Sequence, residues 1–351
     1  MWSYIYEPNK VNEVLAKTKA FLDANPPIAD VLSNIGWAFQ SLWKLIPHTT
    51  ENFFSGHSFA QQEGWEEFQV SVNLAALGLY KQSFTSLRSG LELGLLSIYF
   101  NIDDNGAERI RNWLRSRRSA DAITPRTNSI WKALLGNKNI ATFNEAFGLR
   151  DQYDALSDLS NYVHTRGVKY SNTVGLLKSN YQTFEEEMFL KWLKTYGEVV
   201  AHLATVSLLR FPIGTVRYNW SRKCGIDNPY PVLETWEIER IKRLVSEKHF
   251  AAIEELAKTD PETKALLEYI LEQPDMTDDE KEEQMLNFDK MSIEHGPGFI
   301  EWEKSERNLM ERYDQASRDR SVKRIEILRT WASENDMMYP MADRKAGPGR
   351  S

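Results

Sequence analysis

An arginine and a glutamate stand one helical turn apart in a segment that is otherwise rich in leucine and glycine. Residues four positions apart are neighbours on a helix face, and buried charge is costly unless it is paired, so we expect Arg88 and Glu92 to be mostly buried and in direct contact. The pair either fixes the register of the helix or presents an anion-binding arginine that the glutamate holds in place. Tyr99 continues the same row of side chains, and Gly90 and Gly94 leave room for a second helix to approach closely.

A histidine ends the second polar segment, at the end of another predicted helix. Histidine titrates near neutral pH, so His164 is a candidate general acid or base. Helical spacing places Tyr153, Ser157 and Ser160 on one line with it, and Asn161 lies beside that line, where these polar groups would orient a ligand. The simpler alternative is that His164 only interacts favourably with the dipole of its own helix.

Positive charge is concentrated between Asn105 and Arg150, where nine Arg or Lys stand against three Asp or Glu and give a local net charge of +6. Arginines hold phosphate groups and an aromatic ring stacks on a base, so this stretch is a candidate nucleic-acid surface. The alternative is a solvated helical face. The residues of the candidate surface are Arg109, Arg111, Trp113, Arg115, Arg117 and Arg118.

The composition of the whole chain excludes several classes of protein. Of its 351 residues, 42% are hydrophobic and 26% are charged, which is typical of a globular protein and too apolar for a disordered one. The formal net charge of -7 gives no global sign of nucleic-acid binding. Cys224 is the single cysteine, which excludes an intramolecular disulfide and a multi-cysteine zinc site. His48 and His57 lack partners at metal-ligand spacing, so the sequence predicts no metal and no cofactor.

The apolar segments are too short to cross a membrane. The start of the chain lacks the basic residues and the apolar run of a signal peptide. The most apolar stretch, residues 199–213, contains His202 and Arg210 and falls short of the ~20 apolar residues that a transmembrane helix needs. We therefore expect a soluble cytoplasmic protein with no membrane partner, and we expect His202 to be a core residue of a packed helix.

Apolar residues recur at helical spacing through most of the chain, without the alternation that is typical of strands. This pattern predicts an all-α fold with a central bundle of four long helices. Their apolar faces fall within residues 65–79, 84–98, 149–163 and 189–206, and two earlier helices are expected at 9–23 and 28–45.

Turn residues and helix-start signals divide the predicted fold into parts. Proline, glycine and asparagine are frequent in residues 212–231, which we expect to form a linker after the bundle. Beyond it, Asp260 before Pro261 and Thr277 with Glu280 indicate helix starts, so a smaller helical domain is expected there. The expected division is N-terminal helices at 1–57, the bundle at 58–211 with a basic insertion at about 106–148, a helical C-terminal domain at 232–341 and a disordered tail at 342–351.

Arg88 and Glu92 in one bundle helix, with the sequence Tyr-Val-His at residues 162–164 ending a later one, resemble divergent members of the HEPN superfamily. These are helical-bundle proteins common in prokaryotic defence and toxin–antitoxin systems, and the similarity covers the expected bundle. Many of them are metal-independent ribonucleases that combine an arginine with a histidine a few residues later, usually across a dimer. His164 matches that histidine, whereas residues 157–159 hold serine, aspartate and leucine where the arginine belongs.

The resemblance implies an RNA-targeting defence or toxin-like protein that forms a homodimer and that, where catalytic, is a metal-independent endoribonuclease. His164 would then be the acid or base, and either Arg88 or Arg166 would supply the positive charge at the phosphate. The residues that would support them are Glu92, Tyr99, Tyr153, Ser160 and Asn161. The competing class is a non-catalytic helical scaffold or sensor that binds a partner protein. A polar pocket around His164 would favour the enzyme, and a fully packed Arg88–Glu92 pair would favour the scaffold.

Overall fold

Every regular element of the structure is a helix, within the residues that it describes. The computed structural model describes residues 8–119, 124–164, 166–174 and 183–340. The all-α fold class predicted from the sequence is confirmed for this part of the chain. None of its helices combines the length and the apolar character that a bilayer crossing needs.

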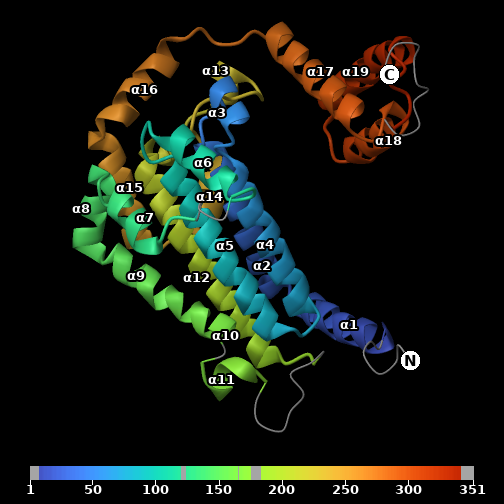
Figure 1. The fold of residues 1–351 in the computed structure, drawn as a ribbon. Helices are drawn as coiled ribbons and strands as arrows, with labels where there is room; N and C mark the ends of the chain where they lie inside the picture. Colours follow the sequence, from blue (N-terminus) through green and yellow to red (C-terminus); the bar gives the residue numbers. More distant parts are fainter. Residues whose placement is uncertain (1–7, 120–123, 165, 175–182, 341–351) are drawn as a thin grey trace. The chain divides into compact units, whose positions relative to one another are not determined.

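Four long helices lie side by side in the centre of the larger part of the fold (Figure 1). The helices α4 and α5 pack along their lengths, and α12 lies against both α5 and α2. Three of the four expected long helices are therefore present as α4, α5 and α12, and α2 supplies the remaining one. Their bounds are Pro26–Ser41 for α2, Phe59–Ala76 for α4, Tyr80–Phe100 for α5 and Glu186–Arg210 for α12.

Two glycines of α5 allow the close helix packing that the sequence predicts. A Cβ atom added at Gly90 would collide with the ring of Phe68 in α4. A Cβ atom added at Gly94 would lie 2.5 Å from a methyl carbon of Leu203 in α12. Both neighbours occupy the volume that a side chain would need, so these glycines set how near α4 and α12 come to α5.

The prediction that one long helix covers residues 149–163 is wrong. Residues 149–164 form α9 (Leu149–Leu156), a 3-10 turn (Ser157–Leu159) and α10 (Ser160–His164). A 3-10 turn has about three residues per turn where an α-helix has 3.6, so the positions that follow it rotate away from the face that α9 presents to the core. As a result Leu149 is fully buried, whereas Val163 is exposed.

The basic insertion forms short helices that cover the bundle. Its apolar residues Ile110, Trp131 and Phe143 are buried against the main core, one from each helix. The insertion therefore belongs to the bundle and presents its charged residues outward. The remaining helices before α12 are α1, which at 17 residues is slightly longer than the 16-residue α2, and the short helices α3 and α11. The bounds are α1 Pro8–Ala24, α3 Thr50–Ser55, α6 Gly106–Arg115, α7 Thr127–Leu134, α8 Lys138–Phe147 and α11 Val168–Ser171.

The chain divides into two compact units, at other positions than those predicted from the sequence. The larger unit, called the bundle unit below, takes the described residues of 1–220 and 229–272, and the smaller unit takes those of 221–228 and 273–351. Residues 232–272, which the sequence pattern assigns to the C-terminal domain, thus belong to the bundle unit. The expected tail at 342–351 lies outside the described residues.

The reason for the different division is apolar burial by helices that follow the expected linker. Ile238 and Ile241 of α14 and Phe250 and Ile253 of α15 are fully buried in the same core as the long helices. The expected linker itself contains the buried Trp220, so its turn residues do not separate two cores. These helices are α14 (Thr235–Lys242), α15 (Glu247–Thr259) and α16 (Pro261–Glu272).

The smaller unit packs around a core of its own, and its helix α17 begins where the sequence predicts. The backbone N–H of Glu280 donates to the Thr277 hydroxyl at 3.2 Å, and the Glu280 carboxylate accepts from the Thr277 backbone at 2.7 Å. Asp260 caps α16 of the bundle unit in the same way, by accepting from the Thr263 N–H at 2.7 Å. The helices of the smaller unit are α13 Ser221–Cys224, α17 Asp278–His295, α18 Phe299–Met310 and α19 Gln315–Glu334.

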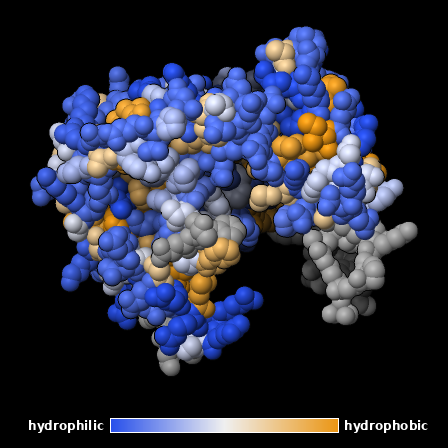
Figure 2. All heavy atoms as spheres, turned by 90° about the horizontal axis from the view of Figure 1, so that it is seen from above, coloured by the Kyte–Doolittle hydropathy of each residue, from blue (hydrophilic) through white to orange (hydrophobic). Residues whose placement is uncertain are grey.

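The surface is mostly hydrophilic on the face that Figure 2 shows, with a few hydrophobic patches between the polar side chains. Single exposed apolar side chains are ordinary on a folded protein. Exposed aromatic side chains that line a hollow are less common, and they indicate a surface that binds a ligand or a partner.

Candidate functional site

Arg88 and Glu92 form the ion pair that the sequence predicts, but only the arginine is buried. Nη2 of Arg88 lies 2.5 Å from Oε1 of Glu92, and the two side chains are 10% and 53% exposed. The expectation that both residues are mostly buried is therefore wrong for Glu92. A glutamate at the edge of the bundle keeps most of its hydration while it pairs with the buried guanidinium, which avoids the cost of removing two charges from water.

The guanidinium of Arg88 also contacts Tyr153, which belongs to α9. Nη1 of Arg88 donates a hydrogen bond of 3.2 Å to the Tyr153 hydroxyl, and the guanidinium carbon lies 5.8 Å from the centre of the ring. Tyr153 is fully buried. Arg88 thus ties α5 to α9 and is engaged on both sides by groups of the protein.

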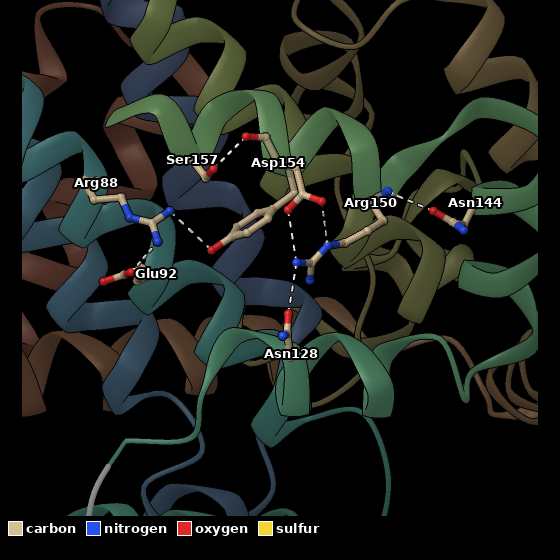
Figure 3. Close-up of polar contacts among 8 residues, drawn as sticks. Arg88, Glu92, Asn128, Asn144, Arg150, Asp154 and Ser157 are labelled. Carbon is tan, nitrogen blue, oxygen red and sulfur yellow. Dashed lines mark hydrogen bonds and ion pairs between the residues drawn. The ribbon is translucent and has the colours of Figure 1, made fainter. Parts of the chain in front are cut away.

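A second arginine lies beside the same tyrosine ring. The guanidinium of Arg150 is 5.4 Å from the centre of the Tyr153 ring and 5.2 Å from that of Trp131. It forms an ion pair of 3.0 Å with Asp154 and donates to the Asn128 side chain at 3.2 Å, as Figure 3 shows. Sequence analysis missed this arginine, although its spacing of four from Asp154 is the same signal that singles out Arg88.

His164 is exposed and is the last residue of α10. Its side chain lines a polar hollow of about 630 Å³. Ser160 and Asn161 line the same hollow, so these two predicted supporting residues are near the histidine. Arg88 does not line it. The full lining is Asp154, Ala155, Ser157, Asp158, Ser160, Asn161, His164 and Arg166.

The carboxylate of Asp158 has fixed partners on this hollow. The Tyr170 hydroxyl lies 2.9 Å from both of its oxygens, and the Asn161 amide donates to Oδ1 at 2.5 Å. Below it, the ring of Tyr162 stacks on Phe84 of α5 at 4.4 Å between ring centres. Burial raises the pKa of Tyr162 to about 12, so its hydroxyl stays protonated at neutral pH. The stacked rings hold the short helix of His164 against the bundle.

Two further residues predicted to support the site lie elsewhere. Tyr153 is not on one line with His164, because the 3-10 turn between them changes the direction of the side chains. Tyr99 contacts the guanidinium of Arg109, whose carbon is 4.5 Å from the centre of the Tyr99 ring. The hollow nevertheless adjoins the arginine network through Asp154, which lines the hollow and pairs with Arg150.

The predicted nucleic-acid surface contains both engaged and unengaged arginines. Arg109 forms an ion pair of 2.7 Å with Asp103 and donates to the backbone oxygen of Tyr99. Trp113 is half-buried against Phe100, at 5.5 Å between ring centres, so its ring is part of the core packing. The remaining side chains are exposed and form no ion pair within the described part of the chain; they are Arg111, Arg115, Arg117 and Arg118.

His202 is a buried core residue, as expected from the sequence. Among the described residues, no three His, Cys, Asp or Glu side chains gather closely enough to hold a metal ion. The groups that could perform chemistry at the candidate site are therefore one imidazole, one guanidinium, two carboxylates and two serine hydroxyls.

Comparison with known proteins provides no relative from which a role could be transferred. No family model, curated protein or solved structure matches the chain. The candidate site is therefore interpreted from its own geometry.

Proposed function

We propose that the chain is an RNA-targeting protein of the helical-bundle type that the HEPN resemblance implies, with a defence or toxin-like role and His164 at its active site. One observation carries the proposal. His164 and Arg166, two residues apart, are both exposed and line one open polar hollow of about 630 Å³. A histidine that moves a proton and a guanidinium that binds phosphate are the groups that metal-independent cleavage of RNA requires.

The reaction follows from these two groups. His164 takes the proton of a ribose 2′-hydroxyl, and the 2′-oxygen forms a bond to the neighbouring phosphorus. The bond from phosphorus to the 5′-oxygen breaks, and the proton passes from His164 to that leaving oxygen. Arg166 stabilises the charge that develops on the phosphate oxygens. Arg88 is a positioning residue in this proposal, because it holds α9 through Tyr153.

The exposed arginines at the end of α6 are proposed to bind the phosphate backbone of the RNA. Arg111, Arg115, Arg117 and Arg118 have no carboxylate partner in the described part of the chain, so their charge is available to an anion. When Lys and Arg side chains bind phosphates they release counterions, which makes the affinity depend on salt. Replacing Arg115, Arg117 and Arg118 with glutamine should weaken RNA binding and reduce the salt slope by roughly one unit for each arginine that binds a phosphate in the wild type.

The matched control for that change lies in the smaller unit. Arg312, Arg320 and Lys323 are exposed as well, and replacing them with glutamine removes the same formal charge. Binding to single-stranded RNA is measured over a series of salt concentrations for both triple variants. An equal salt slope in the two variants would assign the α6 arginines to solvated surface.

Cleavage is tested on total cellular RNA in the presence of EDTA. His164→Ala and Arg166→Gln should each remove most of the activity, since general acid–base catalysis typically contributes ~10²–10⁴-fold to a rate. His295→Ala is the control, because His295 is also an exposed histidine on the last residue of a helix. Cleavage that survives His164→Ala at matched thermal stability would eliminate this histidine as the catalyst.

A second candidate function is a non-catalytic scaffold or sensor that binds a partner protein. The observation in its favour is the packed network in which Arg88 uses both sides of its guanidinium on Glu92 and Tyr153. Absence of cleavage by the wild-type chain, with RNA binding retained, would favour this candidate. The homodimer that the resemblance implies is measured on the same samples by light scattering.

A further inference from the structure

A tryptophan-lined groove lies on the bundle unit, away from the residues of the candidate site. Two hollows, of about 470 and 460 Å³, share Trp37, Gln40 and Trp65 as a common wall. Their residues come mainly from α2, α4 and α14, with Tyr196 of α12 at the second hollow. We call this the Trp groove; its remaining lining residues are Leu32, Ser33, Gly36, Ser41, Trp43, Lys44, Gln61, Gln62, Gln69, Val72, Trp236 and Glu237.

The groove exposes large aromatic rings to solvent. Trp37 and Trp236 are each 53% exposed, although burying a tryptophan is strongly favourable. Trp65 forms part of the wall and stacks on Phe39 of the core, with ring planes 7° apart. Rigid rings anchored in a core and open on one side are the usual feature of sites that bind flat apolar surfaces.

Three indole N–H groups in the wall of the groove have no hydrogen-bond partner in the described part of the chain. They belong to Trp37, Trp65 and Trp236, and an indole N–H is a donor only. Glu237 is the one carboxylate among the described lining residues, and its side chain is almost fully buried in an ion pair of 3.0 Å with Lys44. A ligand that presents acceptor oxygens beside apolar surface would therefore find free donors in the indole N–H groups.

A buried hydroxyl without a partner lies at the second hollow. Tyr196 is fully buried and lines that hollow, and its hydroxyl has no hydrogen-bond partner in the described structure. Gly36 lies above it: a Cβ atom added there would be 3.9 Å from the Tyr196 hydroxyl. An unpaired buried hydroxyl costs free energy, so a ligand oxygen that accepts its hydrogen bond would remove this cost.

Positive charge stands at one side of the groove. The guanidinium of Arg240 lies 5.9 Å from the ring centre of Trp37 and 5.6 Å from that of Trp236. Arg240 has no carboxylate partner in the described part of the chain. The groove therefore combines exposed aromatic rings with one uncompensated cation.

We propose that the Trp groove binds a proline-rich protein segment in the polyproline II conformation, with an acidic residue beside the prolines. Proline rings stack on aromatic walls, and each proline presents a carbonyl oxygen without an N–H of its own, which can accept a hydrogen bond from the free indole N–H groups. Two hollows with a shared wall suit the repeating prolines of such a segment, and its carboxylate would pair with Arg240.

Two other ligand classes fit less well. A neutral sugar could stack on the aromatic rings, but it would leave the charge of Arg240 beside the groove without a partner. RNA would need several free cations along its backbone, whereas the lining cation Lys44 is paired with Glu237 and only Arg240, among the described residues beside the groove, is an unpaired cation. A peptide with few donors and one negative charge is the ligand that uses each of these features.

The test is isothermal titration of the full-length chain with a synthetic oligoproline peptide that carries aspartate at one end. Trp37→Ala should weaken binding at least about tenfold, because an exposed aromatic anchor at the centre of a binding surface typically dominates its affinity. Tyr196→Phe removes only the unpartnered hydroxyl and should weaken binding about three- to tenfold. A peptide with glycine and serine in place of proline should not bind.

The controls separate binding from folding. Tyr269→Ala removes an aromatic side chain of matched exposure, 52%, that lies outside the Trp groove, and it should leave binding unchanged. Tyr196→Phe should not lower the thermal stability, since the hydroxyl that it removes has no partner to leave behind. No binding of oligoproline, or equal binding by Trp37→Ala and wild type, would overturn the proposal. Binding of an oligosaccharide or of single-stranded RNA in its place would assign the groove to another ligand class.

Discussion

Each compact unit has a buried ionisable group at the centre of its packing, and the two groups are accommodated in opposite ways. In the bundle unit, His202 is buried and neither ring nitrogen has a hydrogen-bond partner in the described structure. In the smaller unit, Arg324 lies between the carboxylates of Asp289 and Glu306, at 2.7 and 2.8 Å. His202 is buried as a neutral group, whereas the three charges of the smaller unit compensate each other. We therefore expect the stabilities of the two units to depend on pH through different groups.

His202 is kept neutral by its surroundings. The rings of Trp131 and Tyr153 both lie 5.9 Å from its ring centre, and neither of its ring nitrogens has a hydrogen-bond partner in the described structure. Burial lowers the pKa of His202 to about 4 from an ordinary value of 6.5. Between pH 6.5 and about 4, His202 is therefore protonated in the unfolded chain and neutral in the folded chain.

The three charges of the smaller unit join all of its long helices. Asp289 comes from α17, Glu306 from α18 and Arg324 from α19. Burial raises the pKa of Asp289 to about 6, since the loss of hydration outweighs the attraction of Arg324. We expect this network to fix which faces of the three helices meet, because the apolar core of this unit contains only a few residues.

The largest expected effect comes from removing the central arginine. Arg324→Met leaves two carboxylates buried without a cation, and breaking a buried pair in this way typically costs about 3–5 kcal/mol. We expect hydrogen exchange of the full-length chain to show early opening of residues 273–340, while the bundle unit keeps its protection. The combined variant Asp289→Leu, Glu306→Leu and Arg324→Met should recover most of the stability, because no lone charge remains. Equal destabilisation in the single and the triple variant would show that unpaired buried charge is not the cause of the lost stability.

The second largest effect is a dependence of the stability of the bundle unit on pH. The folded-state pKa of His202 lies below its unfolded value, so the bundle unit should lose stability as the pH falls through 6.5 towards 4, by an amount on the order of 3 kcal/mol. His202→Phe replaces the imidazole with an apolar ring and should flatten this dependence. The measurement is hydrogen exchange of peptides from residues 186–210 over a pH series. A variant with the same pH dependence as wild type would show that other groups cause it.

A smaller effect of opposite sign is expected in the smaller unit. The folded-state pKa of Asp289 lies above its ordinary value of 3.8, so the folded unit binds the proton first and should gain stability as the pH falls from 6 towards 4. Allowing for solvent screening, the gain is about 1–2 kcal/mol. Asp289→Asn should abolish it, when residues 273–340 are followed in the same pH series. A gain that persists in this variant would place the titrating group elsewhere.

Local signals in the sequence predicted much of the fold. The spacing of Phe84, Leu87 and Leu91 identified α5, and the glycines at 90 and 94 indicated where its neighbours approach. Capping residues marked the starts of α16 and α17 correctly, because these hydrogen bonds span only three residues.

Features that depend on packing between distant residues were not predictable in this way. The 3-10 turn at 157–159 changes which residues share a face, and only the packing of α10 on α5 reveals it. Turn residues in 212–231 indicated a linker, whereas the burial of α14 and α15 in the main core decided the division. The Trp groove combines residues from several helices, so its only sign in the sequence is a high tryptophan content.

The smallest expected effect concerns the ion pair between Arg88 and Glu92. Its arginine is mostly buried, like Arg324, whereas its glutamate is exposed to solvent. Glu92→Gln removes an exposed carboxylate, and the guanidinium keeps Tyr153 as a partner, so the cost should be below about 1 kcal/mol. Arg88→Met should cost more, because it leaves the buried Tyr153 hydroxyl without its donor. Chemical unfolding of both variants and of the double variant gives the coupling energy between the two positions. A coupling well above about 1 kcal/mol would show that Glu92 is as tightly held as the charges of the smaller unit, and the distinction drawn between the units would not extend to this pair.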